Sequence, residues 1–290
     1  MGLSLSGMEG HAAAPAAGTV LNALATGTGS AFAIDAETRA TVTLGGRADV
    51  VGTVAGAPEA DTRLVERCVS LVTERYGDGQ GGTVETDSEV PMAAGLKSSS
   101  AAANATVLAT LDALDAAGAV DRETAARIGV EAARDVGVTV TGAFDDASAS
   151  MLGGVTLTDN TTDALLAREE VDWGVLVWTP PERAFSAEAD ADRCRAVAPV
   201  ADLVADLARE GAYERAMTVN GLAFCAALDF SPDPLLEAMP HAEGVSLSGT
   251  GPSFTAVGDA AALGAVRERW AAREGTTWLT TTQSEGATIG

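Results

Sequence analysis

The sequence predicts an α+β protein of two domains, and three observations support this prediction. Apolar side chains recur at helical spacing in segments such as 59–76, whereas segments such as 155–158 are short apolar runs typical of strands. Strands and helices do not alternate strictly along the chain, which favours an α+β arrangement over repeated βαβ units. The length of 290 residues suffices for two cores, and we place the domains at 8–155 and 156–290.

Apolar periodicity, glycine positions and capping residues define the elements of the first half. Leu64, Val65 and Cys68 share one helical face that ends at Gly77, and Asp121 is a plausible N-cap. We expect, in chain order, a short helix near 19–24, strands near 30–34 and 40–44, a helix over 59–76, a strand over 83–91, a long helix from residue 98, a helix over 121–137, a short helical stretch within 139–154 and a strand over 155–158.

The second half contains apolar strands separated by alanine-rich helices, with a glycine-rich turn near its end. We expect strands at 173–179, 244–247, 254–257 and 276–282, and helices around 189–208, 212–229 and 259–272, with the turn SGTGPS after residue 247.

The charge balance excludes several classes of partner. The chain has 41 acidic and 18 basic residues, for a net charge of -23, so a nucleic acid or an anionic membrane would be repelled. Hydrophobic residues make up 47% of the chain, which favours packed domains. The composition resembles that of proteins from extreme halophiles. We find no apolar run long enough for a membrane span and no secretory signal, and we expect a cytoplasmic protein.

Cysteine and histidine chemistry is not expected to be central. Cys68, Cys194 and Cys225 lie far apart, which indicates neither a disulfide framework nor a zinc site. His11 and His241 are the two histidines, so a histidine-ligated metal or a Ser-His-Asp triad is improbable.

The stretch PMAAGLKSSSA contains Lys97, the single lysine of the chain, at the start of a predicted helix. Backbone N–H groups at a helix N-terminus bind phosphate, and a nearby glycine permits the close approach. The loop is not a Walker A sequence, and a serine-capped helix after a turn remains the alternative. The predicted nucleotide-binding residues are Pro91, Met92, Ala93, Ala94, Gly95, Leu96, Lys97, Ser98, Ser99 and Ser100, with Ser99 as a Mg²⁺ ligand.

This loop resembles the signature P-x-x-x-G-L-G-S-S-A-A of the GHMP kinases, named for galactokinase, homoserine kinase, mevalonate kinase and phosphomevalonate kinase. Lys97 occupies the third glycine position and Ser100 replaces an alanine. The form G-L-K-S-S-S-A is similar to the archaeal branch of shikimate kinases. Asn22 and the segment 26–29, TGTG, are similar to that branch's opening motif.

Two further segments resemble family motifs. Asp146 precedes Gly153 by seven residues, as does the aspartate that serves mevalonate-kinase-like members as base or charge partner. A helix cap is the alternative role for Asp145 and Asp146, and Asp145 could instead serve magnesium. The segment 247–257 is similar to the family's C-terminal glycine loop, although alone it would be a simple turn.

The resemblance implies a ribosomal-S5-domain-2-like nucleotide domain, a ferredoxin-like C-terminal domain, and ATP- and Mg²⁺-dependent phosphorylation of the 3-hydroxyl of shikimate. Another GHMP kinase, for homoserine or mevalonate, and a non-catalytic nucleotide-binding module remain alternatives. Asp146 and Lys97 are the predicted catalytic residues, and a monomer or homodimer is expected. The implied substrate-binding residues are Asn22, Thr26, Gly27, Gly29, Asp146, Gly249, Thr250 and Gly251.

Two features of the acceptor site are not fixed by these motifs. The 17 basic residues other than Lys97 are arginines, and the sequence does not select one for the acceptor carboxylate. Mevalonate-type members also place a lysine near the N-terminus beside the catalytic aspartate, and this chain has none there.

Overall fold

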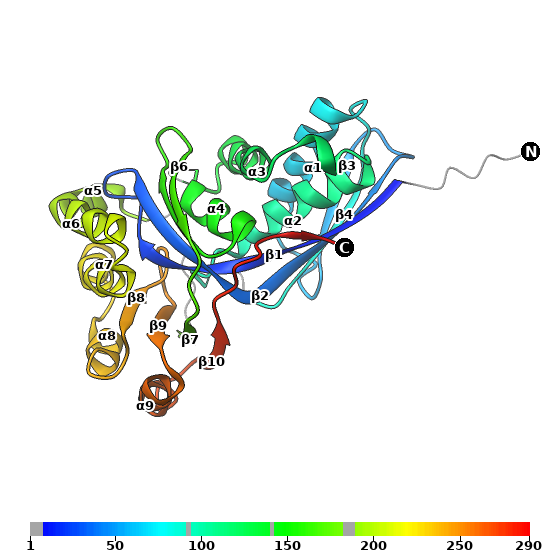
Figure 1. Ribbon diagram of the computed structural model, residues 1–290. Helices are drawn as coiled ribbons and strands as arrows, with labels where there is room; N and C mark the ends of the chain where they lie inside the picture. The colour runs from blue at the N-terminus through cyan, green and yellow to red at the C-terminus, as the bar shows by residue number, and fades with distance from the viewer. Residues whose placement is uncertain (1–7, 91–93, 140–141, 182–188) are drawn as a thin grey trace, which may run out of the picture.

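The computed structural model describes residues 8–90, 94–139, 142–181 and 189–290. Within them, a large sheet and a smaller sheet are each covered by helices (Figure 1). The predicted α+β class is therefore confirmed.

The large sheet is built on two long antiparallel strands, β1 (Met8–Leu21) and β2 (Thr28–Leu44), which run across the molecule in Figure 1. The strand order is β11-β1-β2-β4-β3, and β5 and β6 continue from β2. All neighbours are antiparallel except β3 and β4. The remaining strands are β3 (Val50–Val54), β4 (Gly82–Ser88), β5 (Val155–Asp159), β6 (Ala164–Glu169) and β11 (Thr288–Ile289).

Helices α1 to α4 pack on one face of this sheet (Figure 1). Their bounds are α1 (Arg63–Tyr76), α2 (Ser98–Ala113), α3 (Arg122–Val136) and α4 (Phe144–Leu152), with a 3₁₀ turn at Ala117–Ala119. Helix α2 lies against β1, where a side chain on Gly10 would approach the carbonyl oxygen of Ala109 to 2.1 Å. Glycine therefore allows the close contact that fixes the position of α2.

The smaller sheet is antiparallel, in the order β10-β7-β9-β8, and helices from the same half pack on it. Its strands are β7 (Gly174–Thr179), β8 (Gly244–Leu247), β9 (Phe254–Gly258) and β10 (Thr276–Thr281). The helices are α5 (Ala191–Ala196), α6 (Ala198–Arg209), α7 (Tyr213–Leu228), α8 (Asp233–Ala238) and α9 (Ala260–Trp270).

One hydrophobic cluster joins the two sheets. It contains Phe32 of β2 together with Trp173 and Tyr213 from the second half, and the rings of Phe32 and Trp173 meet edge to face at 5.6 Å. Strands β5, β6 and β11, which follow residue 154 in the chain, also belong to the large sheet. The division at 155/156 stays a prediction.

The helix predicted near 19–24 is wrong, because β1 continues through Leu21 and a turn follows. This segment is buried on both faces, so its apolar run lacks the alternation that marks a half-exposed strand. The two strands expected at 30–34 and 40–44 are one strand, β2. Strands β1, β3, β6 and β11 and helix α8 were not predicted, whereas α1, α2, α3 and α4 were.

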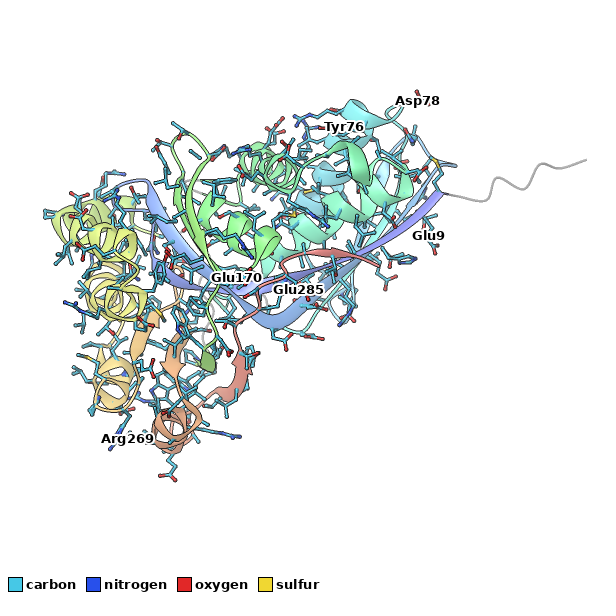
Figure 2. All side chains as sticks on the ribbon, viewed as in Figure 1. Glu9, Tyr76, Asp78, Glu170, Arg269 and Glu285 are labelled. Atoms are coloured by element: carbon cyan, nitrogen blue, oxygen red, sulfur yellow. The ribbon has the colours of Figure 1, made fainter. Side chains whose placement is uncertain are left out.

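The predicted ends of α3 are confirmed in detail. The Asp121 side chain accepts a hydrogen bond from the Thr124 N–H at 2.8 Å, and Gly137 ends the helix in the left-handed region. The acidic side chains of Glu9, Asp78, Glu170 and Glu285 are exposed, and those of Glu9 and Asp78 lie at the edge of the view in Figure 2. No helix among the described residues is long and apolar enough to span a membrane.

Candidate active site

A pocket forms where three loops meet the N-terminus of α4. The loops are the turn after β1, the glycine loop before α2, and the β8–β9 loop. The residues that line the pocket are Asn22, Ala23, Leu24, Lys97, Thr139, Ala143, Asp145, Asp146, Gly249 and Thr250. The hollow measures about 390 Å³, including space open to solvent. None of the arginines is among these lining residues in the described part of the chain.

The glycine loop is held to the protein through its carbonyl groups. Three successive carbonyls accept hydrogen bonds from other segments: Ala94 from the Ser253 N–H at 3.2 Å, Gly95 from the Ser248 hydroxyl at 2.8 Å, and Leu96 from the Ala17 N–H at 3.2 Å. The backbone N–H groups of residues 95–99, in contrast, donate to no acceptor among the described residues. Backbone donors that have no acceptor in the described part of the chain, at the positive end of α2, are suited to an anion such as phosphate.

Two residues of this loop adopt left-handed backbone conformations. Gly95 has a φ of 80°, and a side chain there would approach the carbonyl oxygen of Ser248 to 2.4 Å. Lys97 has φ 63° and ψ 27°, a region that lysine seldom adopts but glycine adopts freely. The family signature that this loop resembles has glycine at this position, which suits the left-handed backbone. The backbone conformation therefore does not account for a lysine here, so its side chain must make a contact that offsets the strain.

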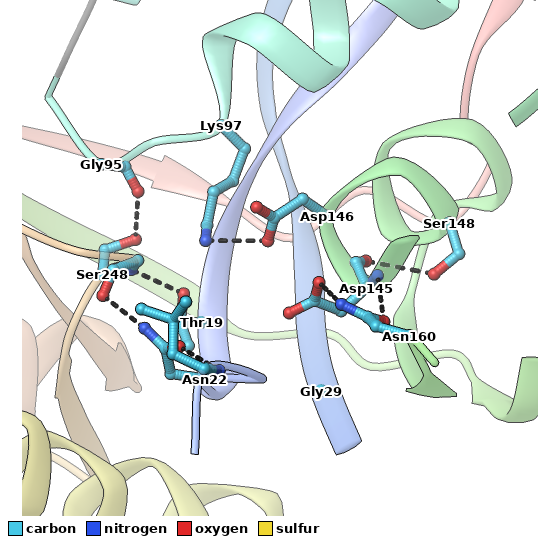
Figure 3. A network of polar contacts seen from close by, with 12 residues as sticks. Thr19, Asn22, Gly29, Gly95, Lys97, Asp145, Asp146, Ser148, Asn160 and Ser248 are labelled. Atoms are coloured by element: carbon cyan, nitrogen blue, oxygen red, sulfur yellow. Dashed lines mark hydrogen bonds and ion pairs between the residues drawn. The ribbon is translucent and has the colours of Figure 1, made fainter. Parts of the chain in front are cut away.

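The Lys97 side chain forms an ion pair with Asp146 inside the pocket. Lys97 Nζ lies 2.7 Å from Asp146 Oδ1, and the two side chains are only 9% and 13% exposed (Figure 3). The lysine side chain passes Gly249, where an added Cβ would lie 2.9 Å from Nζ. The cation beside Asp146 therefore comes from the glycine loop. Mevalonate-type members instead have a lysine near the N-terminus, and this chain has none there.

The protonation of Asp146 is shifted by this environment. Burial raises the pKa of the Asp146 carboxyl, Lys97 opposes the rise, and the charge of Asp145 adds to it, so that the pKa is about 7. A carboxylate with such a pKa can accept a proton near neutral pH.

Helix α4 carries both aspartates into the pocket and is held by two buried amides. The Asn104 side chain on α2 donates to the carbonyl of Ala147 at 2.9 Å, which fixes α4 against the helix that follows Lys97. The Asn160 side chain donates to Asp145 Oδ1 at 2.7 Å and accepts from the Asp145 N–H at 3.1 Å. These contacts define where the carboxylates lie.

Asn22 links the turn after β1 to the β8–β9 loop. Its side chain donates to the carbonyl of Gly249 at 2.9 Å, and its N–H donates to Asn220 Oδ1 at 3.0 Å. The Gly249 N–H donates to the Thr19 hydroxyl at 2.8 Å. Because the Asn22 amide is hydrogen-bonded within the protein, its direct effect is to position the β8–β9 loop, whose Gly249 lies next to the Lys97 side chain.

The structure brings together part of the predicted site. Asn22, Lys97, Asp146, Gly249 and Thr250 line the pocket, as does Asp145. Among the remaining predicted residues, Gly95, Leu96 and Ser98 precede or begin α2, and Leu96 is buried in the core. The predicted Pro91, Met92 and Ala93 lie outside the described residues. The assignment of individual residues to nucleotide or acceptor stays a prediction.

Three predicted glycines and Thr26 are not among the residues that line the pocket, and their contacts are local or structural. The Gly27 carbonyl accepts from the Asn160 N–H at 2.8 Å, and the Thr26 hydroxyl accepts from the Thr28 N–H at 3.3 Å. Gly29 packs on the carboxyl group of Asp145, and Gly251 packs on Phe230.

Sequence reasoning missed Asn104, Asn160 and Asn220, and it left Asp145 without a firm role. A recognisable signal exists for Asn104 and Asn220, since each interrupts an alanine-rich apolar helix with a buried amide. Buried amides are hydrogen-bonded, so such residues commonly join elements.

A magnesium ion fits this site only as part of a nucleotide complex. No group of three or more His, Cys, Asp or Glu residues that could hold a metal occurs within the described ranges. The hydroxyls of Ser98, Ser99 and Ser100 make no hydrogen bond to the described residues. Mg²⁺ typically keeps waters and binds through phosphates plus one or two protein groups, and hydroxyls such as these are of the kind that a Mg²⁺–nucleotide complex uses.

Comparisons with known proteins agree on one family. A profile described as GHMP kinases N terminal domain matches residues 63–154. A protein of Halobacterium salinarum named shikimate kinase is 66% identical over 97% of this chain and 99% of its own length. One of Methanosarcina acetivorans with the same name is 50% identical over 90% of this chain and 89% of its own.

Solved structures show the same fold at low identity. Homoserine kinase from Cytophaga hutchinsonii aligns with a TM-score of 0.76 at 18% identity, covering 100% of each chain. Mevalonate kinase from Methanococcus jannaschii aligns with a TM-score of 0.75 at 11% identity, covering 97% of this chain and 100% of its own.

Proposed function

Because the chain belongs to the GHMP kinases and, within them, to the family of these curated shikimate kinases, we propose that it transfers the γ-phosphoryl group of ATP to the 3-hydroxyl of shikimate. The product, shikimate 3-phosphate, belongs to chorismate and aromatic amino-acid biosynthesis. The GHMP fold alone does not fix the acceptor, so the acceptor is inferred from the close relatives.

The observation that carries the proposal is the position of the Lys97–Asp146 pair beside a row of free backbone donors. Phosphoryl transfer depends mainly on positioning and electrostatic stabilisation. The N–H groups of residues 95–99 hold the triphosphate, and Lys97 stabilises charge on the transferring group. Asp146 orients the acceptor hydroxyl and accepts its proton. The Ser99 hydroxyl would help to hold Mg²⁺, which when bound would supply further positive charge to the phosphates.

An assay of ADP release tests the acceptor directly. With ATP and Mg²⁺ in molar KCl, we expect rapid ADP release with shikimate and little above background with homoserine or mevalonate. High salt is required because the net charge of -23 is poorly screened in dilute buffer. Release with homoserine or mevalonate instead would assign the protein to another GHMP activity. ATP binding without release for any acceptor would indicate a non-catalytic module.

The pH dependence of kcat/KM provides a second prediction. Asp146 must be ionised to accept a proton, and its pKa is raised to about 7. The rate should therefore fall as the pH drops through this range, well above the range of an ordinary aspartate. Initial rates between pH 5 and 9 measure the effect, and an acid limb near pH 4 would exclude Asp146 as the base.

The remaining features of the proposal concern the whole protein. We place the protein in the cytoplasm as a monomer or homodimer, with domains at 8–155 and 156–290. A monomer would contain all the residues that line the pocket, since one chain supplies them.

A further inference from the structure

Asp145 is a buried carboxylate with one fixed and one free oxygen. The residue is 4% exposed and lines the pocket. Oδ1 accepts a hydrogen bond from the Asn160 amide at 2.7 Å, whereas Oδ2 accepts none from the described residues. Oδ2 is not one of the fully buried unpaired atoms found among the described residues, so it is open to the pocket, where a ligand can donate a hydrogen bond to it.

The surroundings hold this carboxylate in one orientation. The Asn160 amide is itself fixed, because its oxygen accepts from the Thr158 hydroxyl at 2.8 Å and from the Asp145 N–H at 3.1 Å. On the other side, a Cβ on Gly29 would lie 2.6 Å from both Cγ and Oδ2 of Asp145. Glycine at this position therefore makes room for the carboxyl group, and its neighbours prevent the group from turning.

The two aspartates differ in their partners. Asp146 is paired with Lys97, next to the glycine loop, whereas Asp145 is paired with Asn160 on the side away from that loop (Figure 3). In this view Asp146 lies between Lys97 and Asp145. Both carboxylates line one pocket, and the charge of Asp145 acts on Asp146, so a molecule whose reacting hydroxyl lies at Asp146 can present a neighbouring polar group to Asp145.

We propose that Asp145 Oδ2 accepts a hydrogen bond from the hydroxyl adjacent to the one that is phosphorylated, so that the pocket selects vicinal diols. This inference rests on the proposed function, and in shikimate the adjacent group is the 4-hydroxyl. Homoserine and mevalonate contain no vicinal diol and cannot engage both carboxylates in this way. Asp145 is then a determinant of acceptor specificity, and Asn160 is a positioning residue.

A substrate analogue isolates this interaction. We would measure kcat and KM of the wild type, Asp145→Ala and Asp145→Asn with shikimate and with 4-deoxyshikimate. Losing a hydrogen bond to a charged group should lower kcat/KM for shikimate roughly 10- to 100-fold in Asp145→Ala. With 4-deoxyshikimate the wild type should be similarly impaired, and the variant should add little further loss. Asp145→Asn can retain the bond to Asn160, so it serves if the alanine variant fails to fold.

Two controls separate this role from a structural one. Asp159→Asn removes one carboxylate at the end of β5, next to Asn160, keeps the oxygen that accepts from the Thr161 N–H, and should leave both substrates unaffected. Asn160→Ala, which frees the Asp145 side chain, should weaken discrimination between shikimate and 4-deoxyshikimate more than it lowers the rate with the deoxy compound.

Three results would overturn the inference. An equal penalty of Asp145→Ala on shikimate and 4-deoxyshikimate would show that Asp145 does not contact the 4-hydroxyl. An increased Mg²⁺ requirement of the variant with both substrates would assign Asp145 to the metal. Wild-type kcat/KM that is equal for the two substrates would exclude a contact at that position. Failure of the wild type to phosphorylate shikimate would instead refute the proposed function.

Discussion

Asp146→Asn is expected to lower kcat by roughly 10²- to 10⁴-fold, the usual contribution of a positioned general base. The substitution keeps the shape of the side chain but removes the proton acceptor. It also removes the negative partner of Lys97, whose side chain is only 9% exposed. The ammonium would then be free to interact with the triphosphate, so ATP affinity should be unchanged or slightly higher.

The measurement combines steady-state kinetics with ATP binding by calorimetry in molar KCl. Asp202→Asn on the exposed side of α6 is a matched control, since it removes one carboxylate far from the pocket and should behave as wild type. An Asp146→Asn enzyme with a near-wild-type rate would show that this carboxylate is not the base. A large loss of ATP affinity would move Asp146 to the nucleotide site.

The local parts of the site were predictable because their signals lie within short segments. The sequence over residues 83–101 indicates a strand, a glycine loop and the start of a helix, and α2 begins at Ser98 as expected. Asp146 was found by its spacing to Gly153, which holds because both belong to α4 and its C-terminal cap. Such spacings depend on helix geometry alone.

Contacts between distant segments were not predictable in the same way. Lys97 and Asp146 are 49 positions apart, and their pairing depends on how α2 and α4 pack through Asn104. The same limit explains the wrong helix near 19–24. Its apolar pattern reflects burial in the hydrophobic cluster that joins the two sheets, and contacts of β1 with helices from both halves of the chain cannot be seen in a single segment.

The hydrogen bonds between Asp145 and Asn160 could not be predicted from the sequence either. Two adjacent aspartates look equivalent in a sequence, and either could be the base. Their roles are separated by the partners that the fold supplies, an ammonium for Asp146 and an amide for Asp145. Glycine at position 29 is then required by a carboxyl group that lies 116 residues further along the chain.

Lys97→Gly is expected to lower kcat by about 10²- to 10³-fold, the typical cost of removing one group that stabilises transition-state charge. Glycine adopts the left-handed conformation of this residue without strain, so a loss of activity cannot be attributed to a distorted loop. ATP affinity should also fall, because the loop then binds the triphosphate with backbone donors alone. The thermal midpoint should change little, since Asp146 can remain protonated once its partner is gone.

The pH profile distinguishes this role from simple phosphate binding. Lys97 opposes the burial that raises the pKa of Asp146, so its removal should raise that pKa above about 7. The acid limb of kcat/KM in Lys97→Gly should therefore move to higher pH, and the deficit relative to wild type should shrink at alkaline pH. Lys97→Met should shift the limb in the same direction. Because both variants act through Asp146, adding Asp146→Asn should cost far less than in the wild type. A limb that does not move, together with additive losses, would show that the two side chains work independently despite their 2.7 Å contact.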